Sequence, residues 1–248
     1  MKKVNIIGSG FSSLSAACHL AKRGFRVEVF EKNSSLGGRA RQFKQDGFTF
    51  DMGPSWYWMP DVFERFFEGF GKKVSDYYKL ERLDPGYQVV FGKDDVFPVY
   101  DSIEKIADCF EMEEKGSGRK LISFLNQAKR NYDVAIDDLV YKPGVSPLEL
   151  VTPVTVKNVG LFLTNVRKQV ERDFKSPKLR SLLQFPVLFL GAKPEQTPAF
   201  YNFMNYADFG LGTWHPKGGM IQIVSAMVSL AKELGVRFHT DAPVSEII

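Results

Sequence analysis

The sequence predicts an α/β protein that begins with a parallel β-α-β unit and continues into a mixed α+β region. Three observations predict the unit. An apolar strand at 4–7 ends at Gly8-Ser9-Gly10, apolar residues recur at helical spacing over 12–23, and a second strand at 27–30 ends at Glu31. Together these features are typical of a Rossmann-like nucleotide-binding domain.

Composition places the chain among ordinary globular proteins. Its 248 residues are 44% hydrophobic and 25% charged, and the net charge of +4 is spread along the chain. Scattered basic residues are a poor electrostatic match for nucleic acid, so no nucleic-acid partner is expected. Cys18 and Cys109 cannot build a disulfide framework, and the three histidines lack metal-ligand spacing. The sequence therefore predicts no metal site and a reducing, cytoplasmic location.

The N-terminal run resembles a secretory signal, because two lysines precede an uncharged stretch from Val4 to Ala21. Asn, Gly and Ser residues interrupt this stretch, whereas a signal peptide needs a compact apolar block. No stretch reaches the roughly 20 apolar residues that span a bilayer. We therefore expect neither a signal peptide nor a transmembrane helix.

The glycine-rich turn has the properties of a diphosphate site. Gly8 permits a tight turn out of the strand, and Gly10 lets the backbone approach a pyrophosphate. The helix that follows, starting near Phe11 and Ser12, directs unpaired N–H groups and its positive dipole end towards an anion. Ser13 replaces the third glycine of the usual motif but is still small. The alternative is a glycine-rich strand–helix turn that binds no ligand.

Glu31 lies at the end of the second strand, where a carboxylate would accept hydrogen bonds from the adenosine ribose hydroxyls. The same charge disfavours a 2′-phosphate and therefore NADP. Lys32, the next residue, is assigned to the same site.

Two further stretches favour FAD over NAD. A Gly-Gly-Arg stretch follows the second strand, and a Phe-Asp-x-Gly-Pro stretch follows a dozen residues later. Here the sequence resembles the superfamily of flavin-containing amine oxidases and phytoene desaturases. The resemblance implies that the Arg contacts the FAD diphosphate and that the second stretch passes the isoalloxazine ring. The residues that take these roles are Gly37, Gly38 and Arg39, and Gly53, Pro54 and Ser55.

Within the superfamily, the chain is most similar to bacterial-type carotenoid (phytoene) desaturases. The resemblance extends over 191–199, over 212–220 with its Trp-x-Pro-x-Gly-Gly segment, and over two apolar stretches at 236–240 and 243–247. These last stretches look like the family's strands that return to the FAD domain, and the resemblance implies that Val244 contacts the adenine through its backbone. The implied organisation is a first part of an FAD-binding domain at 1–80, a substrate domain at 81–211 and a return to the FAD domain at 212–248.

Members of this family are about twice as long. The chain is therefore expected to be the N-terminal half of a longer enzyme, with both domains incomplete at the C-terminus. On its own it is expected to be inactive, to bind FAD weakly and to self-associate through an unpaired sheet edge.

The middle of the chain predicts a hairpin, since apolar stretches at 87–91 and 96–100 flank a polar loop. A capping box formed by Asp101 and Glu104 predicts a helix start. Phenylalanines at helical spacing over 63–70 indicate core. Trp56–Met59 follow the flavin-contacting stretch and are assigned equally to core or to the lining of an apolar substrate site.

The resemblance implies that a hydride passes to FAD from a lipophilic polyene and that a proton leaves the neighbouring carbon, forming a C=C bond. Glu149 lies where relatives carry a candidate acid, although a solvent-exposed Glu is the simpler interpretation. Because such a substrate resides in lipid, we expect peripheral association with the inner face of the membrane. The alternatives are a flavin amine oxidase, a polyene isomerase or saturase, and a truncated chain that serves only as an interaction module. The oligomeric state is not predicted.

Overall fold

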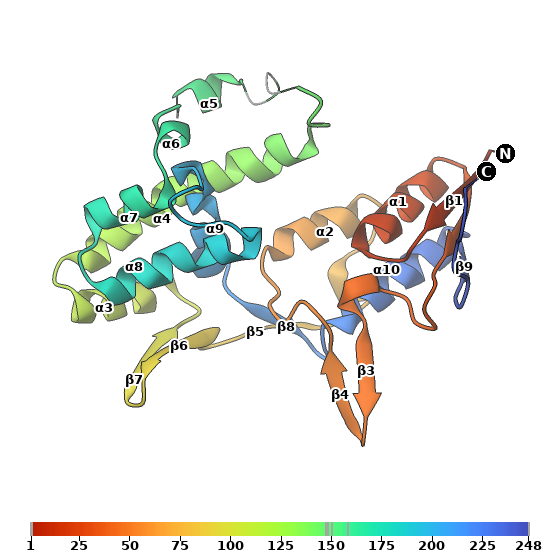
Figure 1. Ribbon diagram of the computed structural model, residues 1–248, viewed down its shortest axis with the longest axis horizontal. Coiled ribbons are helices and arrows are strands. Elements are labelled where there is room, and N and C mark those ends of the chain that lie inside the picture. The colour runs from red at the N-terminus through yellow and green to blue at the C-terminus, as the bar shows by residue number, and fades with distance from the viewer. Residues whose placement is uncertain (1, 147–148, 150, 158, 248) are drawn as a thin grey trace. The chain divides into compact units, whose positions relative to one another are not determined.

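The computed structural model describes residues 2–146, 149, 151–157 and 159–247. The chain divides into two compact units. The first unit comprises Met1–Tyr57, Phe63–Glu81 and Trp214–Ile248, and the second comprises Trp58–Val62 and Arg82–Thr213. The chain contains both helices and strands, as expected for the predicted mixed α/β fold (Figure 1). Each unit is described separately.

The first unit contains a parallel sheet of β1 (Lys3–Ile7), β2 (Arg26–Phe30) and β9 (Arg237–His239), in the order β1-β2-β9 within the described residues. β1 pairs with β2 from Lys3 opposite Arg26 to Ile7 opposite Phe30. β2 is the central strand, and its residues Val27 and Val29 are buried, whereas Ile7 on the edge strand is exposed. The predicted β-α-β unit is confirmed.

Two helices, α1 (Phe11–Lys22) and α10 (Ile221–Glu233), pack together with this sheet (Figure 1). Leu14, Ala17 and Cys18 on α1 are fully buried in one core cluster, which α10 supplies with further apolar side chains. Phe67 of α2 (Pro60–Glu68) is also fully buried there, so the phenylalanines at helical spacing are core, as predicted. Burial of a large apolar side chain such as Leu14 or Phe67 contributes roughly 1.5–3 kcal/mol.

Two small sheets and two 3-10 turns complete the described elements near this unit. Their bounds are β3 (Gln42–Gln45) paired antiparallel with β4 (Phe48–Asp51), β5 (Leu80–Arg82) paired with β8 (Trp214–Pro216), η1 (Gly38–Ala40) and η2 (Val74–Asp76).

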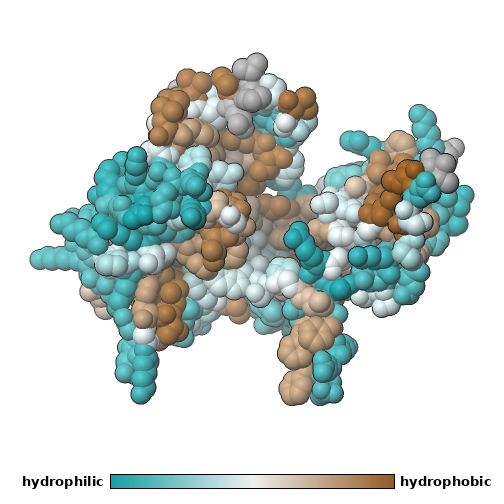
Figure 2. Space-filling model, viewed as in Figure 1, coloured by the Kyte–Doolittle hydropathy of each residue, from teal (hydrophilic) through white to brown (hydrophobic). Residues whose placement is uncertain are grey.

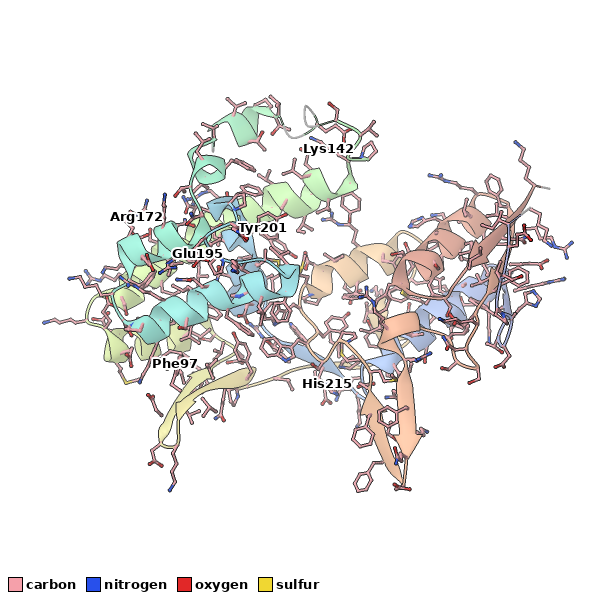
Figure 3. The ribbon with its side chains drawn as sticks, in the orientation of Figure 1. Phe97, Lys142, Arg172, Glu195, Tyr201 and His215 are labelled. Carbon is pink, nitrogen blue, oxygen red and sulfur yellow. The ribbon has the colours of Figure 1, made fainter. Side chains whose placement is uncertain are left out.

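The second unit is mainly helical and carries the antiparallel hairpin of β6 (Tyr87–Gly92) and β7 (Asp95–Val99). Figure 3 labels Phe97 on the hairpin strand β7. Its ring lies edge-on against the ring of Phe110, with 5.8 Å between the ring centroids. A core cluster of aliphatic and aromatic side chains joins the hairpin to the helices. The helices are α3 (Ile103–Glu113), α4 (Ser117–Asp137), α5 (Pro153–Lys157), α6 (Val159–Leu163), α7 (Val166–Asp173), α8 (Pro177–Gln184) and α9 (Phe203–Asn205). The turns are η3 (Leu139–Tyr141), η5 (Phe185–Leu190), η6 (Ala199–Asn202) and the π-helix η7 (Tyr206–Gly210).

Three local details differ from the sequence-based expectations. Ser102, not Asp101, caps α3, since its hydroxyl accepts the N–H of Lys105 at 3.2 Å. Apolar residues recur at helical spacing from Val159 to Val170, which predicts one continuous helix, but the stretch forms two helices because Asn165 caps a new start for α7. The stretch 243–247, which resembled a returning strand, has no strand partner among the described residues and is not a strand.

Candidate functional site

The glycine turn after β1 is fixed by backbone hydrogen bonds. Gly8 has a φ of 87° and donates its N–H to the carbonyl of Phe30 at 2.7 Å. Gly10 is extended and precedes α1, whose first turn has no acidic residue and no side-chain cap. The N-terminus of α1 therefore retains its positive partial charge for an anionic ligand.

A cavity of about 530 Å³ lies against this turn. No atom lies within 4 Å of the position that a Cβ would take on Gly8 or on Gly10, so their missing side chains leave this space open. The cavity is lined by Ile7, Gly8, Ser9, Gly10, Phe30, Glu31, Lys32, Asn33, Gly38, Arg39, Arg41, Ala242, Pro243 and Val244.

Glu31 lines this cavity and is only 3% exposed. Its Oε2 accepts the N–H of Ser9 at 3.0 Å and the Ser9 hydroxyl at 2.6 Å. Its Oε1 accepts the N–H of Asn33 at 2.9 Å and the Asn33 amide at 2.6 Å. Burial acts to raise the pKa of the Glu31 carboxyl, but the hydrogen bonds from Ser9 and Asn33 outweigh it and hold the pKa below its ordinary value. Glu31 is therefore a fixed carboxylate at neutral pH.

Ser9 connects three segments of the site. Its hydroxyl donates to Glu31 and accepts the N–H of Gly37 at 3.1 Å, and its carbonyl accepts the same N–H at 3.2 Å. Because the Gly37 N–H points at the hydroxyl oxygen, the hydroxyl proton is directed to Glu31. The glycine turn, the carboxylate and the Gly-Gly-Arg turn are thus one hydrogen-bonded unit.

The Gly-Gly-Arg turn is held against the stretch that contains Gly53. A Cβ on Gly53 would lie 2.4 Å from the carbonyl oxygen of Arg39, and Gly53 has a φ of 98°. A larger residue would displace the Arg39 backbone, so this close approach requires glycine.

A second cavity, of about 680 Å³, shares Gly10 and Arg39 with the first. Phe11, Ser12, Ser13, Gly37, Ala40, Gly53 and Pro54 also line it. The start of α1 and the turn of Arg39 thus lie along the shared border of the two cavities.

Three basic side chains line the first cavity: Lys32, Arg39 and Arg41. Within the part of the chain that the structure describes, none of the three forms an ion pair with a carboxylate. Unpaired guanidinium groups beside a helix N-terminus suit a diphosphate. A ribose-diphosphate ligand therefore fits the residues that line this cavity, which are an open glycine turn, three basic side chains and a carboxylate.

Most of the residues predicted to bind the cofactor line one or both cavities: Gly8, Gly10, Phe11, Ser12, Glu31, Lys32, Gly37, Gly38, Arg39, Gly53, Pro54 and Val244. Ser55 lines neither, and its assignment stays a prediction. Sequence reasoning missed Ser9 and Asn33 as partners of Glu31, and Arg41 as a third cation. Ser9 was marked by its place between two glycines, and Arg41 by its spacing of two from Arg39, but Asn33 carried no signal.

Glu149 belongs to the second unit, and its carboxylate has a local role there. It accepts the N–H groups of Gly144 at 2.8 Å, Val145 at 3.0 Å and Ser146 at 3.1 Å, which stabilises this turn. Its proposed catalytic role stays a prediction. The described residues contain no cluster of three or more His, Cys, Asp or Glu that would suit a metal ion.

Comparison with known proteins identifies relatives over the whole chain. The chain is 44% identical over 247 residues to a carotenoid 3,4-desaturase of Haloarcula japonica, which covers 98% of this chain and 50% of that protein. It is 34% identical to a zeta-carotene-forming phytoene desaturase of Myxococcus xanthus, over 100% of this chain and 48% of that protein. The chain thus spans about half the length of these curated relatives.

A solved structure of an oxidoreductase from Methanosarcina mazei has the same fold. It matches with a TM-score of 0.59 and 20% identity, covering 100% of this chain and 53% of its own. The family model described as flavin containing amine oxidoreductase matches residues 11–248 and confirms the flavin cofactor that the Gly-Gly-Arg stretch predicted. The chain belongs to the flavin containing amine oxidoreductase family.

Proposed function

We propose that the protein is an FAD-dependent carotenoid desaturase, which removes a hydride and a proton from adjacent carbons of a lipophilic polyene and so forms a C=C bond. The observation that carries this proposal is the 44% identity to a carotenoid 3,4-desaturase across 98% of the chain. The phytoene desaturase relative supports the same substrate class.

The first unit would bind and orient the cofactor. Gly8 and Gly10 leave room for the diphosphate, Arg39 and Arg41 would neutralise its charge, and Glu31 would accept the ribose hydroxyls. The bound flavin would supply the hydride acceptor. Because Glu31 is held as a carboxylate beside this site, it also disfavours a ligand with a 2′-phosphate.

The second unit supplies apolar surface of the kind that a polyene requires. The indole N–H of Trp58 donates to the hydroxyl of Thr213 at 2.8 Å, so the polar edge of this ring is satisfied. The ring itself packs edge-on against Phe189, with 5.0 Å between centroids. Phe189 and its neighbours Leu188 and Leu190 are exposed. Affinity for a substrate without polar groups comes from buried area, and these side chains offer it.

The direct test supplies the purified whole protein with FAD and with phytoene in liposomes, and follows the shift of the polyene absorption to longer wavelength as conjugation grows. Appearance of a more unsaturated product that requires FAD supports the proposal. Flavin binding with unchanged polyenes and with oxidation of an added primary amine would replace it with an amine oxidase activity.

We also propose that the protein associates peripherally with the inner face of the membrane. In the second unit, exposed apolar side chains gather on the described residues between 139 and 163, where Figure 2 shows hydrophobic residues. They are Val140, Tyr141, Val145, Val151, Val156, Val159 and Leu163. Lys142 on the same segment (Figure 3) bonds to Asp138 and to the Glu149 carbonyl. Apolar side chains on short helices can insert at a bilayer surface without spanning it.

Among the helices that the structure describes, none combines the length and apolar character needed to cross a membrane.

A further inference from the structure

The carboxylate of Glu31 has no acceptor direction left for a ligand. An ionised carboxylate offers about four lone-pair directions. Four donors from the described residues use them: the backbone N–H groups and the side chains of Ser9 and Asn33. An adenosine ribose hydroxyl can therefore bond to Glu31 only if one of these donors leaves.

Three of the four donors are fixed. The N–H groups of Ser9 and Asn33 belong to the backbone, and the Asn33 carbonyl is held by the N–H of Asp241 at 3.1 Å. The Ser9 hydroxyl accepts the N–H of Gly37, and the residue as a whole is only 1% exposed. Replacing any of these would disturb the turn that forms the cavity.

The Asn33 side-chain amide is the exception. Asn33 is only partly buried, and it lines the cavity into which its side chain can turn. No hydrogen bond other than the one to Oε1 of Glu31 involves this amide within the described ranges. It is the donor that can leave at the lowest cost.

We propose that Asn33 is a positioning residue whose side-chain amide occupies, on Oε1 of Glu31, the acceptor direction that an adenosine ribose hydroxyl takes over when the cofactor binds. Ser9 holds the other carboxylate oxygen throughout. This inference rests on the proposed FAD site and adds to it a residue that opposes binding. Because the amide must leave first, it lowers the apparent affinity of the site.

The two side chains therefore have opposite effects on binding. Without the Asn33 amide, a ribose hydroxyl displaces only water from Oε1, so affinity rises. Without the Ser9 hydroxyl, Glu31 loses a fixed partner and the Gly37 turn loses an acceptor, so affinity falls.

The experiment is calorimetric titration with ADP, which carries the ribose and the diphosphate. Compared with the unaltered protein, Asn33→Ala and the similarly sized Asn33→Leu are expected to bind ADP about two- to tenfold more tightly, and Ser9→Ala more weakly by a similar factor. Ser15→Ala is the matched control, since the Ser15 hydroxyl makes no hydrogen bond to the described residues. It is expected to bind ADP as the unaltered protein does.

A second ligand tests whether the ribose hydroxyls cause the tighter binding of the Asn33 variants. With 2′,3′-dideoxy-ADP, which has no ribose hydroxyl, the advantage of both Asn33 variants is expected to disappear. Equal or weaker ADP binding by both Asn33 variants, or an advantage that persists with the dideoxy ligand, would overturn the role of Asn33 alone. Failure of the unaltered protein to bind either ADP or FAD would instead overturn the proposed cofactor site.

Discussion

The phenol of Tyr87 donates a 2.5 Å hydrogen bond to Oδ2 of Asp208, a carboxyl group in the π-helix of the second unit that is 1% exposed. Oδ1 of Asp208 is buried and has no hydrogen-bond partner among the described residues. Burial raises the pKa of Asp208 to about 8, an effect that the Tyr87 hydrogen bond only partly offsets. The fold therefore favours the neutral acid.

This pair predicts a stability that decreases with pH. Asp208 has a higher pKa in the folded chain than the ordinary 3.8, so its stabilising contribution is complete below about pH 4 and is lost as pH rises through about 8. The asparagine of Asp208→Asn cannot ionise, so the free energy of unfolding of this variant should not decrease over the same pH range. Since one pKa unit corresponds to about 1.4 kcal/mol, the unaltered protein should lose a few kcal/mol relative to Asp208→Asn between pH 5 and pH 9.

Urea unfolding of both proteins at pH 5, 7 and 9 measures this difference. Tyr87→Phe is a useful companion, because it removes the one hydrogen bond that lowers the pKa of Asp208. Parallel pH profiles for the unaltered protein and Asp208→Asn would show that Asp208 does not ionise in this range.

Gly10→Ala is expected to remove cofactor binding without harming the fold. Gly10 has a φ of −72°, which alanine tolerates, and its Cβ would project into open space that both cavities border. Gly53→Ala should remove cofactor binding and also destabilise the fold, because its Cβ would collide with the Arg39 carbonyl. We expect a free energy of unfolding within about 1 kcal/mol of the unaltered protein for Gly10→Ala and a loss of several for Gly53→Ala.

Flavin fluorescence titration and thermal unfolding separate the two outcomes. Gly24→Ala is the control for backbone strain alone, since Gly24 has a φ of 83° with no atom near its Cβ position. Tight FAD binding by Gly10→Ala would place the diphosphate elsewhere.

Arg39→Ala and Arg41→Ala are each expected to weaken FAD binding by about 1–3 kcal/mol, as lost charge-assisted hydrogen bonds do. The loss should shrink at high ionic strength, because salt screens exposed charges. Lys44→Ala, which removes a charge outside both cavities, should bind FAD unchanged. A loss of affinity in all three variants alike would point to net charge rather than to a diphosphate contact.

Val145→Asp and Leu163→Asp should lower binding to liposomes by about tenfold each, since both side chains are 83% exposed on the apolar segment and would lose the transfer of apolar area. Val90→Asp is the control, at an apolar residue that is 68% exposed on the β6–β7 hairpin. Co-flotation with vesicles measures the effect. Equal flotation of all four proteins would mean that this segment does not contact the membrane.

The sequence predicted the elements whose signal is periodic and missed those that depend on side-chain pairing. Strands β1 and β2 and the turn at Gly8 followed from apolar spacing and glycine. The hydrogen-bond partners of Glu31 could not be predicted, because no spacing rule encodes the hydrogen bond that Asn33 donates to Glu31.

Local competition explains two further differences. Asp101 and Ser102 are both good helix caps, and only the backbone conformation selects Ser102, while Asp101 pairs with Lys105 instead. The stretch 243–247 has strand-like apolar residues, but a strand also requires a neighbour, which local sequence does not specify.

The cofactor site has a consequence for the order of folding. Ser9, Glu31 and Ala242 meet through direct hydrogen bonds, because the Ala242 N–H donates to the Glu31 carbonyl at 2.9 Å and Ser9 binds the Glu31 carboxylate. Contacts between positions so distant in sequence require closure of a long loop, so we expect them to form after the local elements. We expect the turn at Gly8 and the helix after it to form early, but to retain flavin only once the segment around Ala242 has docked on Glu31. A refolding chain should therefore bind flavin more slowly than it regains its helices. The rate of flavin binding would report the rate of the last step of folding.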